Sequence, residues 1–211
     1  MINQKYIFLI LNCNKYRDKA LKQKQTWLSK LPKEILYYHV IGDPLLEEDF
    51  YFDNKEQILY IHVEDDYINL PKKMIRAYNA IQETFNFNYI LKTDDDQNLN
   101  NINFIKTLCN ILEKKEPKIH YGGQIVNVPI PYLSQYYKIH PELPKDLIIQ
   151  STNYSNGRFY FLSKEAIQNL LKKQEQIEKE YLEDYAIGLY LSNQFKEDKM
   201  NITSDKYFTD F

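Results

Sequence analysis

Three consecutive aspartates, Asp94, Asp95 and Asp96, follow directly on the apolar run Tyr89–Leu91 and the pair Lys92-Thr93. Adjacent carboxylates repel one another, so a fold tolerates them where a cation or hydrogen-bond donors lie nearby, or where water screens them. Carboxylates at the carboxyl end of a buried strand lie where α/β sheets bind ligands. Their oxygens suit Mg²⁺ or Mn²⁺, ions that usually also hold substrate phosphates. The run therefore predicts a site for a metal-bound nucleotide.

A solvated surface turn is the competing interpretation of such an acidic run. A calcium-binding EF-hand loop starting at Asp94 is excluded by two positions. Leu99 stands where the sixth position of that loop needs glycine, and Ile105 stands where the twelfth needs glutamate.

The elements that must position these carboxylates alternate along the chain. Apolar runs predict strands, and apolar residues at helical spacing predict helices. Pro71 suits a first helical turn, and Ser163 suits a helix N-cap. We predict strands over 5–13, 35–41, 58–63, 87–91 and 157–162, and helices over 15–30, 70–81, 104–112, 163–179 and 183–195. This order predicts one α/β domain over residues 1–211, with a largely parallel sheet flanked by helices.

Two segments lack such a pattern. Residues 121–155 are rich in proline and tyrosine, and we expect a long functional loop or lid there. The residues after 195 are polar, and we expect them to be loosely held.

Composition excludes several classes of protein. A net charge of −2 gives no bulk electrostatic reason to bind nucleic acid. Cys13 and Cys109 are predicted to be reduced thiols, and the apolar run Tyr6–Leu11 is too short to be a transmembrane segment. We therefore expect a cytoplasmic protein (in the host cytoplasm or with the virion if viral) rather than one of the Golgi lumen.

Five short motifs follow one another in a recognisable order. They are Thr26-Trp27, Asp66-Tyr67-Ile68-Asn69-Leu70 with Lys73, Lys92-Thr93-Asp94-Asp95-Asp96, Tyr154 to Ser163, and Glu183-Asp184-Tyr185-Ala186-Ile187-Gly188. This order resembles the β-1,3-glycosyltransferase family, which includes galactosyltransferases, N-acetylglucosaminyltransferases and Fringe-type enzymes. The resemblance runs from about Arg17 to about Leu189.

The resemblance implies a GT-A, Rossmann-like fold, a UDP-sugar donor, Mn²⁺ or Mg²⁺, and inversion at the anomeric carbon. The nucleotide would bind mainly to residues 1–100, and the acceptor and catalytic part would lie mainly in residues 101–211. The product would be a glycan or glycoconjugate, with a hexose or N-acetylhexosamine added in a β-1,3 linkage.

The resemblance also assigns roles to residues. Asp96, with Asp94, would bind the metal, while Asp94 and Asp95 would lie near the ribose and phosphates. Asp184 would be the catalytic base, assisted by Glu183. The remaining assignments are Lys73, Trp27, Arg17 and Lys92 on the donor side, and Tyr154, Gly157, Arg158 and Tyr160 on the acceptor side. Because Asp184 begins a predicted helix, we expect the helix dipole to lower its pKa.

The chain departs from the family pattern in several ways. Phe159 stands where the family has its second glycine, and Tyr185 replaces the usual valine. Many GT-A enzymes use a C-terminal histidine as a metal ligand, but no histidine follows Asp184. Asp205 or Asp210 could take its place, or the diphosphate and water could complete the coordination.

These departures keep a second function open, a non-catalytic GT-A module that binds nucleotide or glycan as a partner subunit. A nucleotidyltransferase is a third interpretation, but residues 13–18 contain no glycine for a phosphate-binding loop. Aromatic faces suit sugar rings, so we expect the acceptor to pack against the segment 121–137, which contains Tyr132, Tyr136 and Tyr137.

Overall fold

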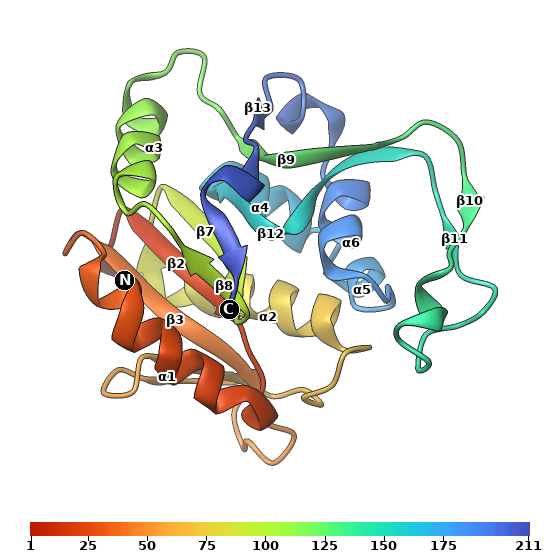
Figure 1. Ribbon diagram of the computed structural model, residues 1–211, viewed down its shortest axis with the longest axis horizontal. Coiled ribbons are helices and arrows are strands. Elements are labelled where there is room, and N and C mark those ends of the chain that lie inside the picture. The colour runs from red at the N-terminus through yellow and green to blue at the C-terminus, as the bar shows by residue number, and fades with distance from the viewer.

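The computed structural model describes residues 1–211 and has a central eight-stranded sheet with helices on both faces (Figure 1). The order of strands in this sheet is β13-β9-β12-β7-β2-β3-β5-β4. Its middle strands β7, β2, β3 and β5 are parallel to one another. The strands are β1 (Ile2–Asn3), β2 (Tyr6–Leu11), β3 (Ile35–Gly42), β4 (Phe50–Asp53), β5 (Ile58–Ile61), β6 (Phe85–Asn86), β7 (Tyr89–Asp94), β8 (Gln97–Leu99), β9 (Tyr121–Val128), β10 (Tyr132–Leu133), β11 (Ile148–Ile149), β12 (Thr152–Ser163), β13 (Met200–Asn201) and β14 (Phe208–Asp210).

The helices are α1 (Arg17–Thr26), α2 (Leu70–Thr84), α3 (Asn103–Lys114), α4 (Lys164–Leu171), α5 (Gln174–Ile177) and α6 (Glu183–Tyr190). Ser163 caps α4 by accepting a hydrogen bond from the Ala166 N–H at 3.2 Å, as its position predicted. Pro71 lies in the first turn of α2, also as predicted.

Strand β2 lies between two apolar cores and contributes to both, because its side chains alternate between the faces of the sheet. Ile7, Leu9 and Leu11 belong to a core that also contains apolar residues of α2, α4 and α6. Tyr6, Phe8 and Ile10 belong to a second core that contains Trp27 and residues of α3. The six residues of β2 are all buried. The predicted α/β class, with a mostly parallel central sheet flanked by helices, is confirmed.

Three predictions of local structure are wrong. The polar, acidic stretch that ends at Glu56 predicts a loop, but it contains the edge strand β4, in which Phe50 and Phe52 pack against the core. Residues 121–128 are not a loop but strand β9, which pairs antiparallel with β12. The C-terminal residues are not loosely held, because β14 pairs with β8 and lies beside it in Figure 1. Strands β9 and β14 pair with strands distant in sequence, whereas β4 pairs with the neighbouring strand β5.

Three predicted helices are shorter than their patterns indicate, and the first of them, predicted over 15–30, is α1 at Arg17–Thr26. The helix predicted over 163–179 breaks into α4 and α5, and the helix predicted over 183–195 ends at Tyr190. Residues 129–151 form an excursion from the ends of β9 and β12, with the small ribbon β10–β11 at its base (Figure 1). The long loop predicted in this region is therefore confined to that excursion.

Candidate active site

Strand β7 delivers the three aspartates, as predicted. It lies between β2 and β12, and its residues from Tyr89 to Thr93 are all buried. Asp94 is its last residue, and Asp95 and Asp96 form the turn that leads into β8. Asp94 thus lies at the edge of the sheet where the parallel strands end, which is where α/β proteins bind ligands.

Two buried side chains from the α1 region fix the backbone of this turn. The Gln23 amide donates hydrogen bonds to the backbone oxygens of Asp94 at 3.0 Å and Gln97 at 2.9 Å. The Trp27 indole N–H donates to the same Gln97 oxygen at 3.1 Å. Both side chains are buried. Trp27, predicted on the donor side, therefore supports the acidic turn through the backbone.

Gln23 was missed by sequence reasoning, although a signal for it exists. It lies three residues after Ala20 and four before Trp27, so it belongs to the buried face of α1. A glutamine at such a position needs buried polar partners. Its carbonyl oxygen faces Nε2 of buried His39 at 2.9 Å, which completes its hydrogen bonding.

Asp95 is held by two other residues. Asn12, which follows β2, donates to Asp95 Oδ2 at 2.8 Å, and Lys19 lies 3.3 Å from Oδ1. Burial raises the pKa of Asp95, while Lys19 and Asn12 oppose the rise. Lys73 donates to the Asn12 backbone oxygen at 2.9 Å and to Asp65 at 2.7 Å, and it is fully buried. Its ammonium therefore fixes the end of β2 and reaches Asp95 only through Asn12.

Strand β12 carries a bulge that faces the acidic turn. Its register against β9 shifts between Ser155, which pairs with Ile125, and Tyr160, which pairs with Gly123. The Ser155 hydroxyl donates to the Phe159 backbone oxygen at 3.5 Å and closes the bulge. Gly157 lies within it. A Cβ atom at Gly157 would lie 3.1 Å from Asp94 Oδ2 and 3.6 Å from Asp184 Oδ2. Gly157 therefore separates the two carboxylates to which different roles were assigned.

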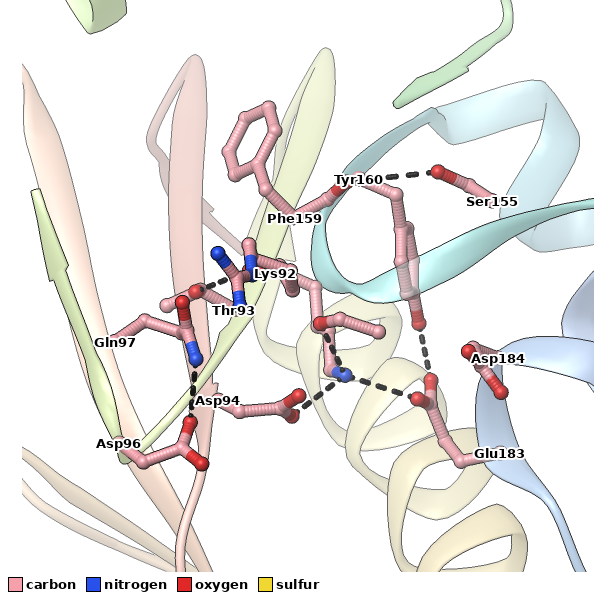
Figure 2. Close-up of polar contacts among 12 residues, drawn as sticks. Lys92, Thr93, Asp94, Asp96, Gln97, Ser155, Phe159, Tyr160, Glu183 and Asp184 are labelled. Atoms are coloured by element: carbon pink, nitrogen blue, oxygen red, sulfur yellow. Dashed lines mark hydrogen bonds and ion pairs between the residues drawn. The ribbon is translucent and has the colours of Figure 1, made fainter. Parts of the chain in front are cut away.

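Lys92 lies next to Gly157 and the two carboxylates, with its side chain 1% exposed. Its ammonium contacts Asp94 Oδ1 at 2.8 Å, Glu183 Oε2 at 3.0 Å and the Gly157 backbone oxygen at 3.0 Å (Figure 2). Burial disfavours the charged amine, but the two carboxylates outweigh it and raise the pKa of Lys92. Burial raises the pKa of Asp94 to about 7, with Lys92 opposing the rise.

Glu183 is a buried anchor. Its Oε1 accepts a short hydrogen bond from the Tyr160 hydroxyl, which is itself 2.6 Å from the Tyr78 hydroxyl. Both its oxygens are thus occupied, one by Tyr160 and one by Lys92. Tyr160, predicted on the acceptor side, instead lies in the core and orients Glu183.

Asp184 is the second residue of α6, next to Glu183, and is only partly buried. Burial raises its pKa to about 6, and the charge of Glu183 adds to the rise. Lys92 and the backbone N–H groups of Tyr185 and Gly157 act in the opposite direction. The predicted lowering of this pKa is therefore wrong, because burial and Glu183 outweigh the donors at the helix start.

Asp96 is linked to the C-terminal strand through one amide group. Gln97 Nε2 donates to Asp96 Oδ1 at 2.7 Å and to Asp210 Oδ1 at 2.9 Å. Arg158 lies 3.0 Å from Asp210 and 3.1 Å from Asp205. Of the two C-terminal aspartates, only Asp210 shares a donor with Asp96. Arg158, predicted on the acceptor side, therefore contacts strand β14, where it also donates to the Phe208 backbone oxygen.

The remaining predicted residues lie outside the carboxylate group. Tyr154 is buried and packs edge-on against Tyr185. Arg17 packs over the Tyr60 ring at 5.8 Å. Tyr67, which sequence reasoning quoted only as part of a motif, stacks on His140 with ring centroids 3.8 Å apart. Burial raises the pKa of Tyr67 to about 12, and the charge of Asp184 adds to the rise.

Comparison with known proteins identifies the family. The family model described as Galactosyltransferase matches residues 18–200. The chain belongs to this galactosyltransferase family. The predicted membership of a β-1,3-glycosyltransferase family is confirmed.

The chain is similar to two related kinds of enzyme. It is 24% identical over 153 residues to UDP-GalNAc:beta-1,3-N-acetylgalactosaminyltransferase 2 of Xenopus tropicalis, covering 71% of this chain and 29% of the relative. It is 25% identical over 179 residues to UDP-GalNAc:beta-1,3-N-acetylgalactosaminyltransferase 1 of Sus scrofa, covering 81% of this chain and 52% of that relative. The chain thus spans between about a third and a half of the length of these relatives.

Among solved structures, the chain is similar to a glycosyltransferase involved in the glycosylation of the major capsid of PBCV-1. The TM-score is 0.44 at 15% identity, covering 82% of this chain and 65% of that one. It is also similar to the glycosyltransferase GlyE of Streptococcus pneumoniae TIGR4, with a TM-score of 0.49 at 10% identity, covering 97% of this chain and 46% of that one.

The expected cytoplasmic location is contradicted, because the relatives are Golgi-type glycosyltransferases. That expectation was drawn from features missing in this sequence, which spans only part of its relatives. No helix of the structure combines the length and the apolar character needed to cross a bilayer.

Proposed function

We propose that this family member is an inverting glycosyltransferase domain. It transfers a hexose or N-acetylhexosamine from a UDP-sugar to a hydroxyl of a glycan or glycoconjugate, in a β-1,3 linkage. One observation carries the proposal. The Asp94 carboxylate of the acidic turn and the Asp184 carboxylate of α6 approach the same point above Gly157, at 3.1 and 3.6 Å from a Cβ built there.

Asp184 is the proposed base. The acceptor oxygen forms a bond to the anomeric carbon while the bond from that carbon to the diphosphate oxygen breaks and its electron pair leaves with UDP. Asp184 takes the proton of the acceptor hydroxyl. A base with a pKa of about 6 is mostly ionised at neutral pH and more basic than an ordinary aspartate. A base of this kind contributes about 10²- to 10⁴-fold to the rate.

The acidic turn has the chemistry of a site for Mg²⁺ or Mn²⁺. Its donors are carboxylate oxygens, and buried amide oxygens of Asn12, Gln97 and Asn156 close to the turn have no hydrogen-bond partner. No three histidine, cysteine or carboxylate side chains come together to hold a metal alone. Asp96, with Asp94 near it, would therefore hold the ion together with the donor diphosphate. The ion would neutralise the charge that develops on the departing diphosphate.

Asp210 is the better of the two candidates for a further ligand from the C-terminal segment. The Gln97 amide that it shares with Asp96 keeps the two carboxylates close. Asp205, by contrast, contacts Arg158 and Gln124.

Aromatic residues near Asp184 support a sugar acceptor. Tyr132 and Tyr136 are 43% and 42% exposed, and the charge of Asp184 contributes to the raised pKa of Tyr136 after burial. The same charge adds to the rise that burial causes in the pKa of Tyr67. We propose that the acceptor packs against these rings, whereas Tyr137 is partly buried against the core.

A donor screen tests the function. UDP-, GDP- and TDP-sugars are incubated with and without Mn²⁺, with and without simple sugar acceptors, and released nucleoside diphosphate is measured. The names of the relatives make UDP-GalNAc the first donor to test. Metal-dependent release of UDP supports a transferase. Binding of UDP without release from any donor would instead favour a non-catalytic module.

A further inference from the structure

Lys92 joins three elements that are distant in sequence. Its ammonium contacts Asp94 in β7, Gly157 in the bulge of β12 and Glu183 at the start of α6, at 2.8 to 3.0 Å. An ammonium group has three protons. These three contacts use all of them, so Lys92 keeps no donor for a phosphate or a sugar. Its predicted role in donor binding is therefore replaced by contacts within the protein.

The position of this ammonium is closely determined. A buried charge costs much free energy unless it is paired and hydrogen-bonded, so displacement of Lys92 from its partners is strongly disfavoured. Glu183 is equally constrained, because Tyr160 occupies its second oxygen and Tyr78 contacts Tyr160. Asp94 and Glu183 therefore cannot move independently of each other.

The two carboxylates belong to different halves of the proposed reaction centre. Asp94 lies beside Asp95 and Asp96 in the turn proposed to bind the metal and nucleotide. Glu183 precedes Asp184, the proposed base, in the first turn of α6. The link between them runs through one side chain, as Figure 2 shows.

We propose that Lys92 is a positioning residue that couples nucleotide binding at the acidic turn to the helix start that carries the base. The proposal rests on the proposed function. It means that loss of the Glu183 charge, on the acceptor side, changes the affinity of the donor side for metal and nucleotide. The change passes through Lys92, which would then pair with Asp94 alone and make that carboxylate less available.

The test measures binding of UDP with Mn²⁺ by isothermal titration calorimetry. Glu183→Gln is compared with Asp184→Asn, a matched change one residue away at a carboxylate that does not contact Lys92. We expect Glu183→Gln to weaken binding by about 3- to 30-fold, which lies within the range for residues in one hydrogen-bond network. Asp184→Asn should leave the affinity within about twofold, since the Asp184 carboxylate does not contact Lys92.

Two further variants complete a double-mutant cycle. In a Lys92→Met background, Glu183→Gln should have no additional effect on UDP affinity. Lys92→Met alone leaves two carboxylates without their counter-ion and can fail to fold, but the double variant Lys92→Met/Glu183→Gln removes one charge of each sign. If Lys92→Met does not fold, the comparison of Glu183→Gln with Asp184→Asn still decides whether the coupling exists.

Equal affinities for wild type, Glu183→Gln and Asp184→Asn overturn the coupling while leaving the proposed function intact. An effect of Glu183→Gln that persists in full without Lys92 overturns it as well. Absence of any UDP binding by the wild type overturns both the coupling and the proposed function.

Discussion

Replacement of Asp184 by asparagine separates catalysis from stability. Asparagine has the same shape and keeps an oxygen for the Tyr185 N–H, which lies 2.8 Å from Asp184 Oδ1. It cannot take a proton from an acceptor hydroxyl. We therefore expect kcat to fall by about 10²- to 10⁴-fold, the usual contribution of a general base. The fall is measured as UDP release with the donor that the screen identifies.

The same change should stabilise the fold at pH 8. Folding raises the pKa of Asp184 from 3.8 to about 6, so the folded state favours the protonated form. The stability that this group contributes is present below its unfolded pKa and is lost as pH rises through 6. The full shift corresponds to about 3 kcal/mol. Because Asp184 is partly exposed, water screens it, and we expect a gain of about 1–2 kcal/mol in the variant.

Thermal unfolding of the unliganded protein at two pH values measures this gain. A gain of that size should raise Tm by about 2–8 °C at pH 8, and the difference should shrink towards zero near pH 4. A lower Tm for the variant at pH 8 would refute the claim that burial makes the charged carboxylate costly. Turnover at the wild-type rate would refute the role of Asp184 as the base.

Four further variants, one of which is a control, test the rest of the site. Asp210→Asn should weaken Mn²⁺-dependent UDP binding by about tenfold or more. The control Asp205→Asn, which removes another carboxylate next to Arg158, should not weaken it. Equal effects of the two variants would exclude Asp210 as a residue of the metal site. Gly157→Ala should lower kcat/KM by about 10- to 100-fold, since the added Cβ would lie 3.1 Å from Asp94 Oδ2. Unchanged kinetics would show that the substrates do not bind close to Gly157. Tyr136→Ala should raise the acceptor KM by about 2- to 10-fold with little change in kcat; an unchanged KM would exclude the ring as an acceptor platform.

The sequence was informative where local pattern and tertiary structure agree. The apolar run that leads to Asp94 is a buried strand, and its carboxylates lie at the edge of the sheet where the parallel strands end. The amphipathic pattern from Leu70 to Ile81 lies within α2, and its Pro71 lies in the first turn. The order of the five motifs indicates the same family as the match over residues 18–200, because motif order is a property of the sequence alone.

The parts that could not be predicted depend on pairing over long distances. Strand β14 has one apolar residue, Phe208, which is buried in the core that contains Trp27, and the strand pairs with β8. That pairing brings Asp210 to Gln97, more than a hundred residues away, and no spacing rule within the chain reveals it. The bulge at Gly157 similarly depends on the different registers that β12 adopts against its two neighbours.

Lys73 and Lys92 show why residue type and motif position alone do not assign a role. Both match positions on the donor side of the family pattern, and both are buried with a carboxylate within 2.8 Å. Lys73 pairs with Asp65 and fixes the backbone at the end of β2, so its partners lie within the half of the domain that we propose binds the nucleotide.

Lys92 has partners in both halves of the domain, from Asp94 to Glu183. What distinguishes the two lysines is therefore which elements their partners join, and that is a property of the sheet order. Strand β12 places its bulge, and with it α6, next to β7 rather than next to β2 or β3. A change at Lys73 should consequently affect nucleotide binding alone, whereas a change at Lys92 should affect both nucleotide binding and the position of the base.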